Sequence, residues 1–346
     1  MQYRKILGSL DAAVFFNMDS TTVNPCFTYL SGFTGAGALI VKRRASMILI
    51  TPAMELRRAR KVFQGKLVRW RPEPLLKQII RMIPRAGTVG YDADTLPVSY
   101  YKALKKNSNA KFVDVSGAIK KQRQIKSSSE LAKISRACAI GDQVLGYIYK
   151  HWHEYKTESD IAAALRWQTA KKGYRVSFDP IVASGKNAAI PHHEPVNTPL
   201  QKGFCVIDYG VFVDNYASDM TRTVGIGKCS QKERKLYQSV LDLQEELVAS
   251  ATHGKRITEL VQQHNSGLKS IGYRPLHALG HGIGIEVHES PSLSLKSKET
   301  LHKGMVIAIE PGIYRQNVFG IRIEDTVAIA DTPRILTKTT KKLIVF

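Results

Sequence analysis

Apolar and polar residues alternate along the first third of the chain in short blocks, as in strands and helices that follow each other. Ala12–Phe16 predicts a buried strand, and the runs Ala38–Val41 and Met47–Thr51 flank a Lys-Arg-Arg-Ala turn and predict a hairpin. Helices are then predicted over Met54–Phe63, Pro74–Ile83 and Ser99–Lys106. They alternate with strands predicted over Lys66–Trp70, Thr88–Tyr91 and Lys111–Val115. This alternation predicts an α/β domain that ends near Ser116.

A polar and basic segment over residues 117–129 precedes a part of different character, and we expect the domain boundary within it. Helices are predicted over Glu130–His151, Glu158–Lys172, Lys232–Ala251 and Ile257–Ile271. Strands are predicted over Ile181–Ala183, Phe204–Asp208, Asn215–Val224, Met305–Ile309, Ile313–Arg315, Ile321–Ala330 and Leu336–Phe346. We therefore expect an N-terminal α/β domain over residues 1–128 and a C-terminal α+β domain over residues 129–346.

Length and composition agree with this division. The 346 residues are enough for about two domains, and the 43% hydrophobic content excludes wholesale disorder. The longest apolar runs fall far short of the ~20 residues that cross a bilayer, and no signal-peptide pattern opens the chain. Its four cysteines are widely spaced, which is typical of neither a disulfide framework nor a zinc ribbon. We expect a cytoplasmic protein without a membrane partner.

The formal net charge of +22 raises the question of nucleic acid. Residues 1–128 carry 23 Lys and Arg against 7 Asp and Glu, so most of the excess lies in the first domain. The basic residues are dispersed, and no nucleic-acid-binding signature accompanies them. We therefore expect a solvated basic surface rather than a nucleic-acid partner, and we keep an acidic partner or a nucleic-acid side function as the alternative.

Acidic residues and histidines gather in four segments of the second domain. The first segment places Asp208 and Asp219 on the two arms of a predicted hairpin. A turn on Val213–Asp214 would make them direct partners, and a turn on Asp214–Asn215 would make them diagonal neighbours. In both cases the side chains leave one face of the sheet, with Cβ atoms about 5–8 Å apart. Carboxylates that close repel each other unless one is protonated or a cation lies between them.

The second segment holds His277, His281 and His288 in a glycine-rich run. The glycines disfavour a helix, so His277 and His281 are not a helical zinc pair. Glycine instead allows the backbone to approach a site closely and to direct an imidazole into it.

In the third and fourth segments Glu310 and Glu324 each interrupt an apolar strand. A buried Glu is costly unless it is paired or bound to a metal. Because Arg322 shares a face with Glu324, a buried Arg–Glu ion pair is the alternative explanation of the fourth segment. Two Asp, one His and two Glu together suit a pair of divalent cations bridged by a hydroxide that hydrolyses an amide. The chain has neither a phosphate-binding glycine loop nor a serine nucleophile elbow.

The four segments resemble the metal-binding signature of the pita-bread metallopeptidases, in the branch of Xaa-Pro dipeptidase (prolidase) and aminopeptidase P. Phe27–Phe33 is similar to the Tyr-Leu-Thr-Gly-Phe stretch of that branch's N-terminal domain, and Ile125–Glu130 resembles its interdomain link. The resemblance extends over the whole chain. It implies an α+β pita-bread (creatinase/aminopeptidase-like) catalytic domain behind an α/β, ribonuclease-H-like N-terminal domain of the creatinase type.

The resemblance also implies a role for each residue. Asp208 would bind one metal, His281 and Glu310 would bind the other, and Asp219 and Glu324 would bridge both. Glu310 would also act as general base. His288 would stabilise the tetrahedral intermediate, and His277 would support the site from outside the ligand set. Arg322 would donate a hydrogen bond into the site. His192 would transfer a proton to the leaving nitrogen. His193, directly beside His192, is the alternative for the last role.

We therefore expect a metallo-exopeptidase that hydrolyses the Xaa-Pro bond at the N-terminus of dipeptides or short peptides. Two divalent ions per subunit are expected, Mn²⁺ or Co²⁺, while the single His also admits Zn²⁺ or Fe²⁺. The resemblance implies a homodimer. The alternative is a catalytically weak or inactive binding protein of the same fold, whose basic N-terminal domain recruits acidic partners. The sequence does not separate dipeptides from longer peptides as substrates.

Overall fold

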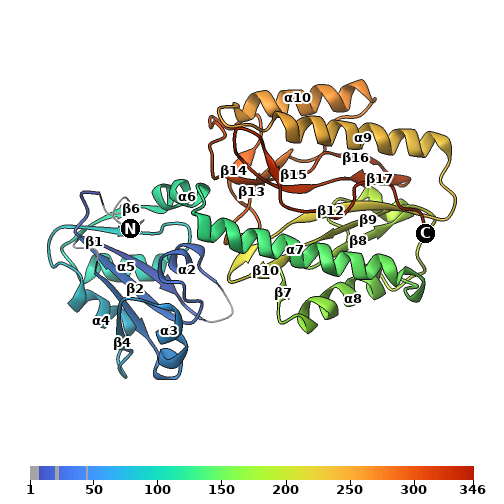
Figure 1. The fold of residues 1–346 in the computed structure, drawn as a ribbon. Coiled ribbons are helices and arrows are strands. Elements are labelled where there is room, and N and C mark those ends of the chain that lie inside the picture. Colours follow the sequence, from blue (N-terminus) through green and yellow to red (C-terminus); the bar gives the residue numbers. More distant parts are fainter. Residues whose placement is uncertain (1–7, 20–22, 44–45) are drawn as a thin grey trace. The chain divides into compact units, whose positions relative to one another are not determined.

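The chain forms two compact units, residues 1–123 and residues 124–346 (Figure 1). The computed structural model describes residues 8–19, 23–43 and 46–346. The division lies slightly before the domain limit expected at residue 128. Among the described residues, no helix is long and apolar enough to cross a membrane. The four cysteines are buried and free.

Unit 1 is built on a six-stranded sheet in the order β4-β3-β2-β1-β5-β6. The strands β1, β2 and β3 are antiparallel, whereas β1–β5, β5–β6 and β3–β4 pair in parallel. The strands are β1 (Ala12–Asn17), β2 (Gly37–Lys42), β3 (Met47–Thr51), β4 (Lys66–Arg69), β5 (Thr88–Tyr91) and β6 (Lys111–Asp114). The helices are α2 (Pro25–Ser31), α3 (Leu56–Val62), α4 (Leu75–Met82), α5 (Val98–Lys106) and α6 (Ser116–Gln124), and a 3₁₀ turn covers Ala53–Glu55.

Both faces of this sheet are covered by helices, which explains why the central strands β1 and β2 are buried along almost their whole length. Successive residues of β1 point to opposite faces. Phe15 lies in a core with α2, α3 and α6, whereas Val14 and Phe16 lie in a second core with α4 and α5. The strand–helix alternation predicted for this unit is thus the observed arrangement.

The two units divide within the polar segment over residues 117–129, and the helix α6 occupies most of that segment. Ile119 is fully buried in the core that also holds Phe15, and it anchors the helix to the sheet. A single buried apolar residue among basic ones gives almost no periodicity, so the helix was hidden in the sequence. The next helix, α7, begins with a capping box in which Ser127 and Glu130 bond each other's backbone N–H.

Unit 2 places its strands between two pairs of helices, as Figure 1 shows. The helices α7 (Ser128–Lys150) and α8 (Glu158–Lys171) pack on a sheet of β8 (Ile181–Ser184), β9 (Gly203–Tyr209) and β12 (Met220–Ile226). The helices α9 (Gln231–Ser250) and α10 (Ile257–Ser270) pack on a second core, which includes residues of a five-stranded sheet. That sheet consists of β14 (Glu289–Leu293), β13 (Gly280–Gly282), β15 (Val306–Ile309), β18 (Asp325–Ala328) and β19 (Arg334–Ile335).

Shorter elements complete unit 2. The strands β7 (Arg175–Val176), β10 (Val211–Val213) and β11 (Tyr216–Ala217) form one small sheet, and β16 (Gly312–Arg315) pairs with β17 (Phe319–Arg322). The 3₁₀ turns cover Trp152–Glu154 and Gly185–Ala189.

Two predicted strands are broken, each at a carboxylate. The strand expected over Asn215–Val224 divides into β11 and β12 at Ser218-Asp219, and that over Ile321–Ala330 divides into β17 and β18 at Ile323-Glu324. At both breaks the carboxylate residue lies outside the strand ladder. The strand predicted over Leu336–Phe346 is also wrong, since this segment is irregular apart from a bridge between Val345 and Gly225.

The turn of the first hairpin decides between the two registers left open by the sequence. Asp214 and Asn215 have φ values of 47° and 68°, the left-handed region required at both central residues of a type I′ turn. Val213 pairs with Tyr216, and further along Asp208 pairs with Thr221. Asp219 is therefore the diagonal neighbour of Asp208, and the turn on Asp214–Asn215 is confirmed.

This turn gives a prediction for stability. We expect Asn215→Val to lower the free energy of unfolding by about 1–2 kcal/mol, because a β-branched residue does not tolerate positive φ. Asn215→Gly, the matched control, keeps the turn and should remain within a few tenths of a kcal/mol of the parent. Urea denaturation of the three proteins measures both changes. An equal loss for Val and Gly would show that the backbone conformation does not limit this position.

Candidate metal centre

Every residue that the sequence placed in the site lines one cavity of unit 2, with a volume of about 540 Å³. These residues are His192, Asp208, Asp219, His277, His281, His288, Glu310, Arg322 and Glu324. They come from segments far apart in the sequence, which the sheets of unit 2 bring together.

The side chains that could hold a metal come from strands or from their ends. Asp208 is the last but one residue of β9, and Asp219 directly precedes β12. His281 is the central residue of β13, Glu310 directly follows β15, and Glu324 lies in the break between β17 and β18. Because the strands on which they lie pack in the cores of the unit, their backbone positions are fixed.

These five side chains form overlapping clusters. Ligand atoms of Asp208, Asp219 and Glu324 lie within 4.8 Å of one another, as do those of His281, Glu310 and Glu324. Asp219 also clusters with His281 and His288, and its Oδ2 lies 3.6 Å from His281 Nε2. Asp219, His281 and Glu324 each belong to two clusters, and of these three only the carboxylates have two oxygens to share between neighbouring cations.

Three carboxylate oxygens in this cluster show that the donor set fits cations. Asp208 Oδ1, Asp219 Oδ1 and Glu324 Oε1 are buried and have no hydrogen-bond partner among the described residues. Buried polar atoms are seldom left unpaired, because the loss of hydration is not compensated. A cation bound between these three oxygens in the cavity would compensate for their lost hydration.

Burial and mutual repulsion govern the protonation of these groups in the protein without metal. Burial, together with Glu324, raises the pKa of Asp219 well above its usual range. Burial raises the pKa of Glu310 to about 8. In contrast, burial and the neighbouring His288 lower the pKa of His281 to about 4, so its imidazole is neutral. His281 Nδ1 lies 3.1 Å from the Gly282 carbonyl, which leaves Nε2 with a free lone pair.

Arg322 is buried and holds Asp208 in place. Its Nη2 donates to Asp208 Oδ2 at 2.7 Å, and its Nη1 donates to the Pro191 carbonyl at 3.2 Å. Glu324 Oε2 accepts instead from Thr221 Oγ1 at 2.6 Å. The buried partner of Arg322 is therefore Asp208, and the Arg322–Glu324 ion pair considered from the sequence is wrong.

Tyr314, which no sequence pattern indicates, connects Arg322 to His277. His277 Nδ1 lies 2.8 Å from the Ala278 carbonyl, so Nδ1 carries the proton and Nε2 accepts. The Tyr314 hydroxyl donates to that Nε2 at 2.9 Å and accepts from Arg322 Nη1 at 2.9 Å. A tyrosine in a short apolar strand gives no signal of this kind, because strands are rich in tyrosine whatever their function.

The adjacent histidines 192 and 193 differ in their surroundings. His192 lines the cavity, whereas His193 Nε2 lies 2.7 Å from Glu158 Oε2. Glu158 is buried and also accepts from the backbone N–H of Ser184 and of Val196. His193 is thus engaged in a structural network, and the geometry favours His192 as the residue that meets a substrate.

The comparisons with known proteins decide the family. Residues 132–331 match the model of metallopeptidase family M24, and residues 7–125 match that of the creatinase/prolidase N-terminal domain. The chain belongs to metallopeptidase family M24. The pita-bread fold and its N-terminal domain, expected from the sequence, are confirmed, and so is the assignment as a metal-dependent peptidase.

Relatives of known name agree along the whole length. The Xaa-Pro dipeptidase of Pyrococcus horikoshii is 34% identical over 328 residues, which are 93% of this chain and 92% of that protein. The X-Pro aminopeptidase of Thermotoga maritima superposes with a TM-score of 0.92 at 28% identity and covers 99% of each chain. The prolidase of Pyrococcus furiosus has a TM-score of 0.86 at 31% identity, over 98% of this chain and 100% of that one.

The raised pKa of Glu310 gives a prediction for metal binding. A metal must displace the proton of each ligand, and His281 is already neutral at pH 7, so any proton released comes from a carboxyl. We expect binding of Mn²⁺ to the metal-free M24 protein at pH 7 to release about one proton or more per chain, and the release to fall as the pH rises above 8. Calorimetry in buffers of different ionisation enthalpy measures the number.

The matched control is Glu310→Gln, which cannot release that proton. Its release at pH 7 should be smaller than that of the parent by about one proton. Equal release from both proteins would show that Glu310 is ionised before the metal arrives.

Proposed function

We propose that this M24 chain hydrolyses the bond between an N-terminal residue and a following proline, in dipeptides or short peptides. The observation that carries the proposal is the cluster of four carboxylates and one histidine with three unpaired buried oxygens. The specificity rests on the relatives, since the names of those compared above all refer to Xaa-Pro peptidase or prolidase activity. The complete ligand set argues against an inactive binding protein.

Two divalent ions are the cofactor that the geometry supports best. Asp208 would bind the first ion, His281 and Glu310 would bind the second, and the shared carboxylates of Asp219 and Glu324 would bridge them. A donor set of four carboxylates and one imidazole favours Mn²⁺ and admits Co²⁺, with Zn²⁺ or Fe²⁺ as further candidates. When bound, such a pair supplies Lewis-acid activation of the scissile carbonyl and of a water.

The chain's own residues would then provide orientation and proton transfer. Glu310, which loses its proton when metal binds, would then be the general base that accepts a proton from water. His288 lines the same cavity, and burial lowers its pKa, so it is a neutral donor for the developing oxyanion. His192 would give a proton to the proline nitrogen, which carries no hydrogen of its own and leaves only when protonated. Arg322 orients Asp208 through its 2.7 Å bond and the Pro191–His192 segment through the Pro191 carbonyl.

The proposal extends to assembly and location. The homodimer implied by the family resemblance stays a prediction. A cytoplasmic location is supported by the four buried free cysteines, which are typical of a reducing compartment.

Hydrolysis of Xaa-Pro peptides by the metal-loaded protein tests the proposal. We expect release of the N-terminal residue from Xaa-Pro or Xaa-Pro-Yaa-Zaa peptides with Mn²⁺ or Co²⁺, and little from the matched peptides with Ala in place of Pro. Asp219→Asn and Glu324→Gln should lower kcat at least about 10³-fold, because each removes a charge shared by both ions. Glu259→Gln, an exposed residue of α10, is the control. Full activity in Asp219→Asn and Glu324→Gln would contradict the metal mechanism, and the ratio of the two substrates separates dipeptidase from aminopeptidase activity.

The neighbouring histidines give a second test. We expect His192→Ala to lower kcat by roughly 10²–10⁴-fold, the usual contribution of a general acid. His193→Ala removes the bond to Glu158, so it should lower the melting temperature and change kcat by only a few-fold. Steady-state kinetics and thermal unfolding of both variants distinguish the residues. The reverse pattern would assign the proton transfer to His193.

A further inference from the structure

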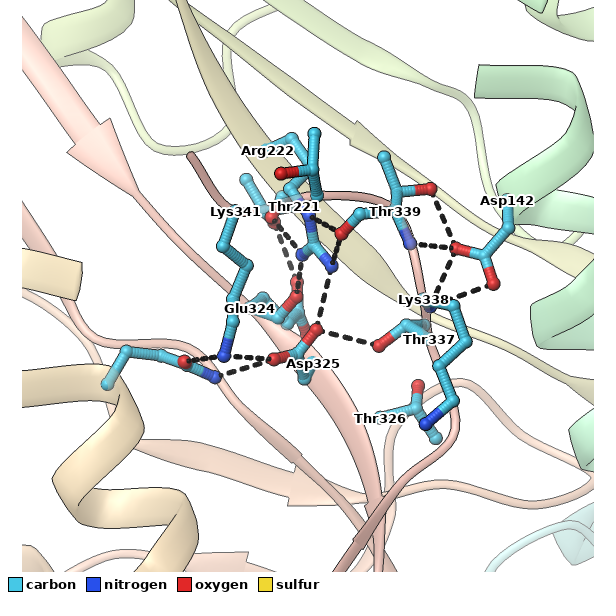
Figure 2. Close-up of polar contacts among 12 residues, drawn as sticks. Asp142, Thr221, Arg222, Glu324, Asp325, Thr326, Thr337, Lys338, Thr339 and Lys341 are labelled. Atoms are coloured by element: carbon cyan, nitrogen blue, oxygen red, sulfur yellow. Dashed lines mark hydrogen bonds and ion pairs between the residues drawn. The ribbon is translucent and has the colours of Figure 1, made fainter. Parts of the chain in front are cut away.

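Arg222 and Asp325 form a buried ion pair next to the metal centre but outside the lining of its cavity. Arg222 Nη2 lies 2.8 Å from Asp325 Oδ1, and the two side chains are 2% and 0% exposed. Arg222 belongs to β12, and Asp325 directly follows Glu324 at the start of β18. Figure 2 shows that the pair is enclosed by the C-terminal segment, Thr337–Lys341.

All five N–H donors of the Arg222 guanidinium are used. Nη1 donates to the backbone carbonyls of Thr221 and Glu324, Nη2 donates to Asp325 and to the Thr339 carbonyl, and Nε donates to the same Thr339 carbonyl. The planar guanidinium therefore fixes the backbone of Glu324 against β12 and the C-terminal segment. A lysine would offer neither this fork nor its geometry.

The Asp325 carboxylate is held equally fully. Its Oδ1 also accepts from Thr337 Oγ1 at 2.8 Å, and its Oδ2 accepts from Gln244 Nε2 and Lys341 Nζ, each at 3.0 Å. Two of these partners, Thr337 and Lys341, belong to the C-terminal segment. Lys341 Nζ also donates to Gln244 Oε1 at 2.7 Å, so the segment is tied to α9 as well.

Asp142 of α7 anchors the segment from the other side, as Figure 2 shows. Its carboxylate accepts from the backbone N–H groups of Lys338 and Thr339 at 2.7–2.9 Å. The Thr339 hydroxyl donates to it at 2.7 Å. Two hydrogen bonds from Thr339 to Asp142 therefore fix the position of Thr339, whose carbonyl accepts from Arg222.

Two threonines, Thr221 and Thr326, connect this hydrogen-bond network to Glu324 and Asp219, the two residues proposed to be shared by both ions. Thr221 Oγ1 donates to Glu324 Oε2 at 2.6 Å, while the Glu324 N–H donates to the Thr221 carbonyl at 3.1 Å. Thr326 Oγ1 donates to the Asp219 carbonyl at 2.7 Å. The strand break at Asp219 is thus held by a residue of β18, and the break at Glu324 is held by a residue of β12. Both residues, Thr326 and Thr221, are sequence neighbours of the ion pair Asp325–Arg222.

We propose that Arg222 and Asp325, held by the C-terminal segment, are positioning residues that fix Glu324 in its place at the metal pair. Stability alone does not explain this ion pair, because a buried salt bridge adds little net stability compared with apolar residues of similar volume. The inference rests on the proposed function in that it takes Glu324 as a metal ligand.

Metal affinity tests this role separately from stability. Mn²⁺ binding to the metal-free full-length chain is measured by calorimetry, together with the melting temperature of the metal-free protein. We expect Arg222→Lys, which keeps the charge but loses the fork, to weaken the lower-affinity Mn²⁺ site about 10- to 100-fold, the usual effect of a residue that orients a ligand. Asp142→Ala should act in the same direction by a smaller factor.

The control is Ser230→Ala, which removes the capping box of α9 in the same unit. It should lower the melting temperature yet leave both Mn²⁺ affinities unchanged. If Arg222→Lys does not fold, Asp142→Ala and Thr337→Val, both remote from the cavity, decide the question. Parent-like Mn²⁺ affinities in the folded variants would overturn the inference. A parent protein that neither binds Mn²⁺ nor cleaves Xaa-Pro peptides would instead overturn the proposed function.

Discussion

The mutual repulsion of buried carboxylates is the constraint on which this molecule depends. Asp208, Asp219, Glu310 and Glu324 share one cavity, and in the absence of positive charge burial and neighbouring carboxylates raise the pKa values of Asp219, Glu310 and Glu324. Such a cluster is unfavourable for folding unless the surrounding structure enforces it. The rest of unit 2 does so, because its strands bring the four residues together and Arg322 compensates part of the charge at Asp208.

Three of the four carboxylates, Asp219, Glu310 and Glu324, lie where a strand ends or breaks, whereas Asp208 lies within the ladder of β9 and β12. A regular ladder would direct alternate side chains to a packed face, and a carboxylate there would be buried without compensation. At Asp219 and Glu324 the strands are interrupted, and the freed backbone groups are taken up by Thr326 and Thr221. The same chain positions therefore serve both the fold and the chemistry.

The site was predictable from the sequence because its residues are chemically conspicuous. A Glu within an apolar run and three His among glycines have few structural explanations, and their resemblance to a family pattern gave each a role. The hairpin register was left open, since both turns kept Asp208 and Asp219 on one face, and only the positive φ values of Asp214 and Asn215 distinguish them. Tyr314, Arg222 and the threonines were not predictable, because their function lies in contacts between distant segments. The helix α6 has no apolar periodicity from which it could be predicted, since a single apolar residue, Ile119, attaches it to the core.

The central claim is that Asp219 and Glu324 bridge two cations, and anomalous diffraction from crystals grown with Mn²⁺ tests it most directly. The account predicts two anomalous peaks roughly 3.5–4 Å apart, as in other two-metal sites, each in contact with both bridging carboxylates. His281 and Glu310 should contact only one of the peaks, and Asp208 only the other. A single peak, or two peaks that do not share Asp219 and Glu324, would contradict the account.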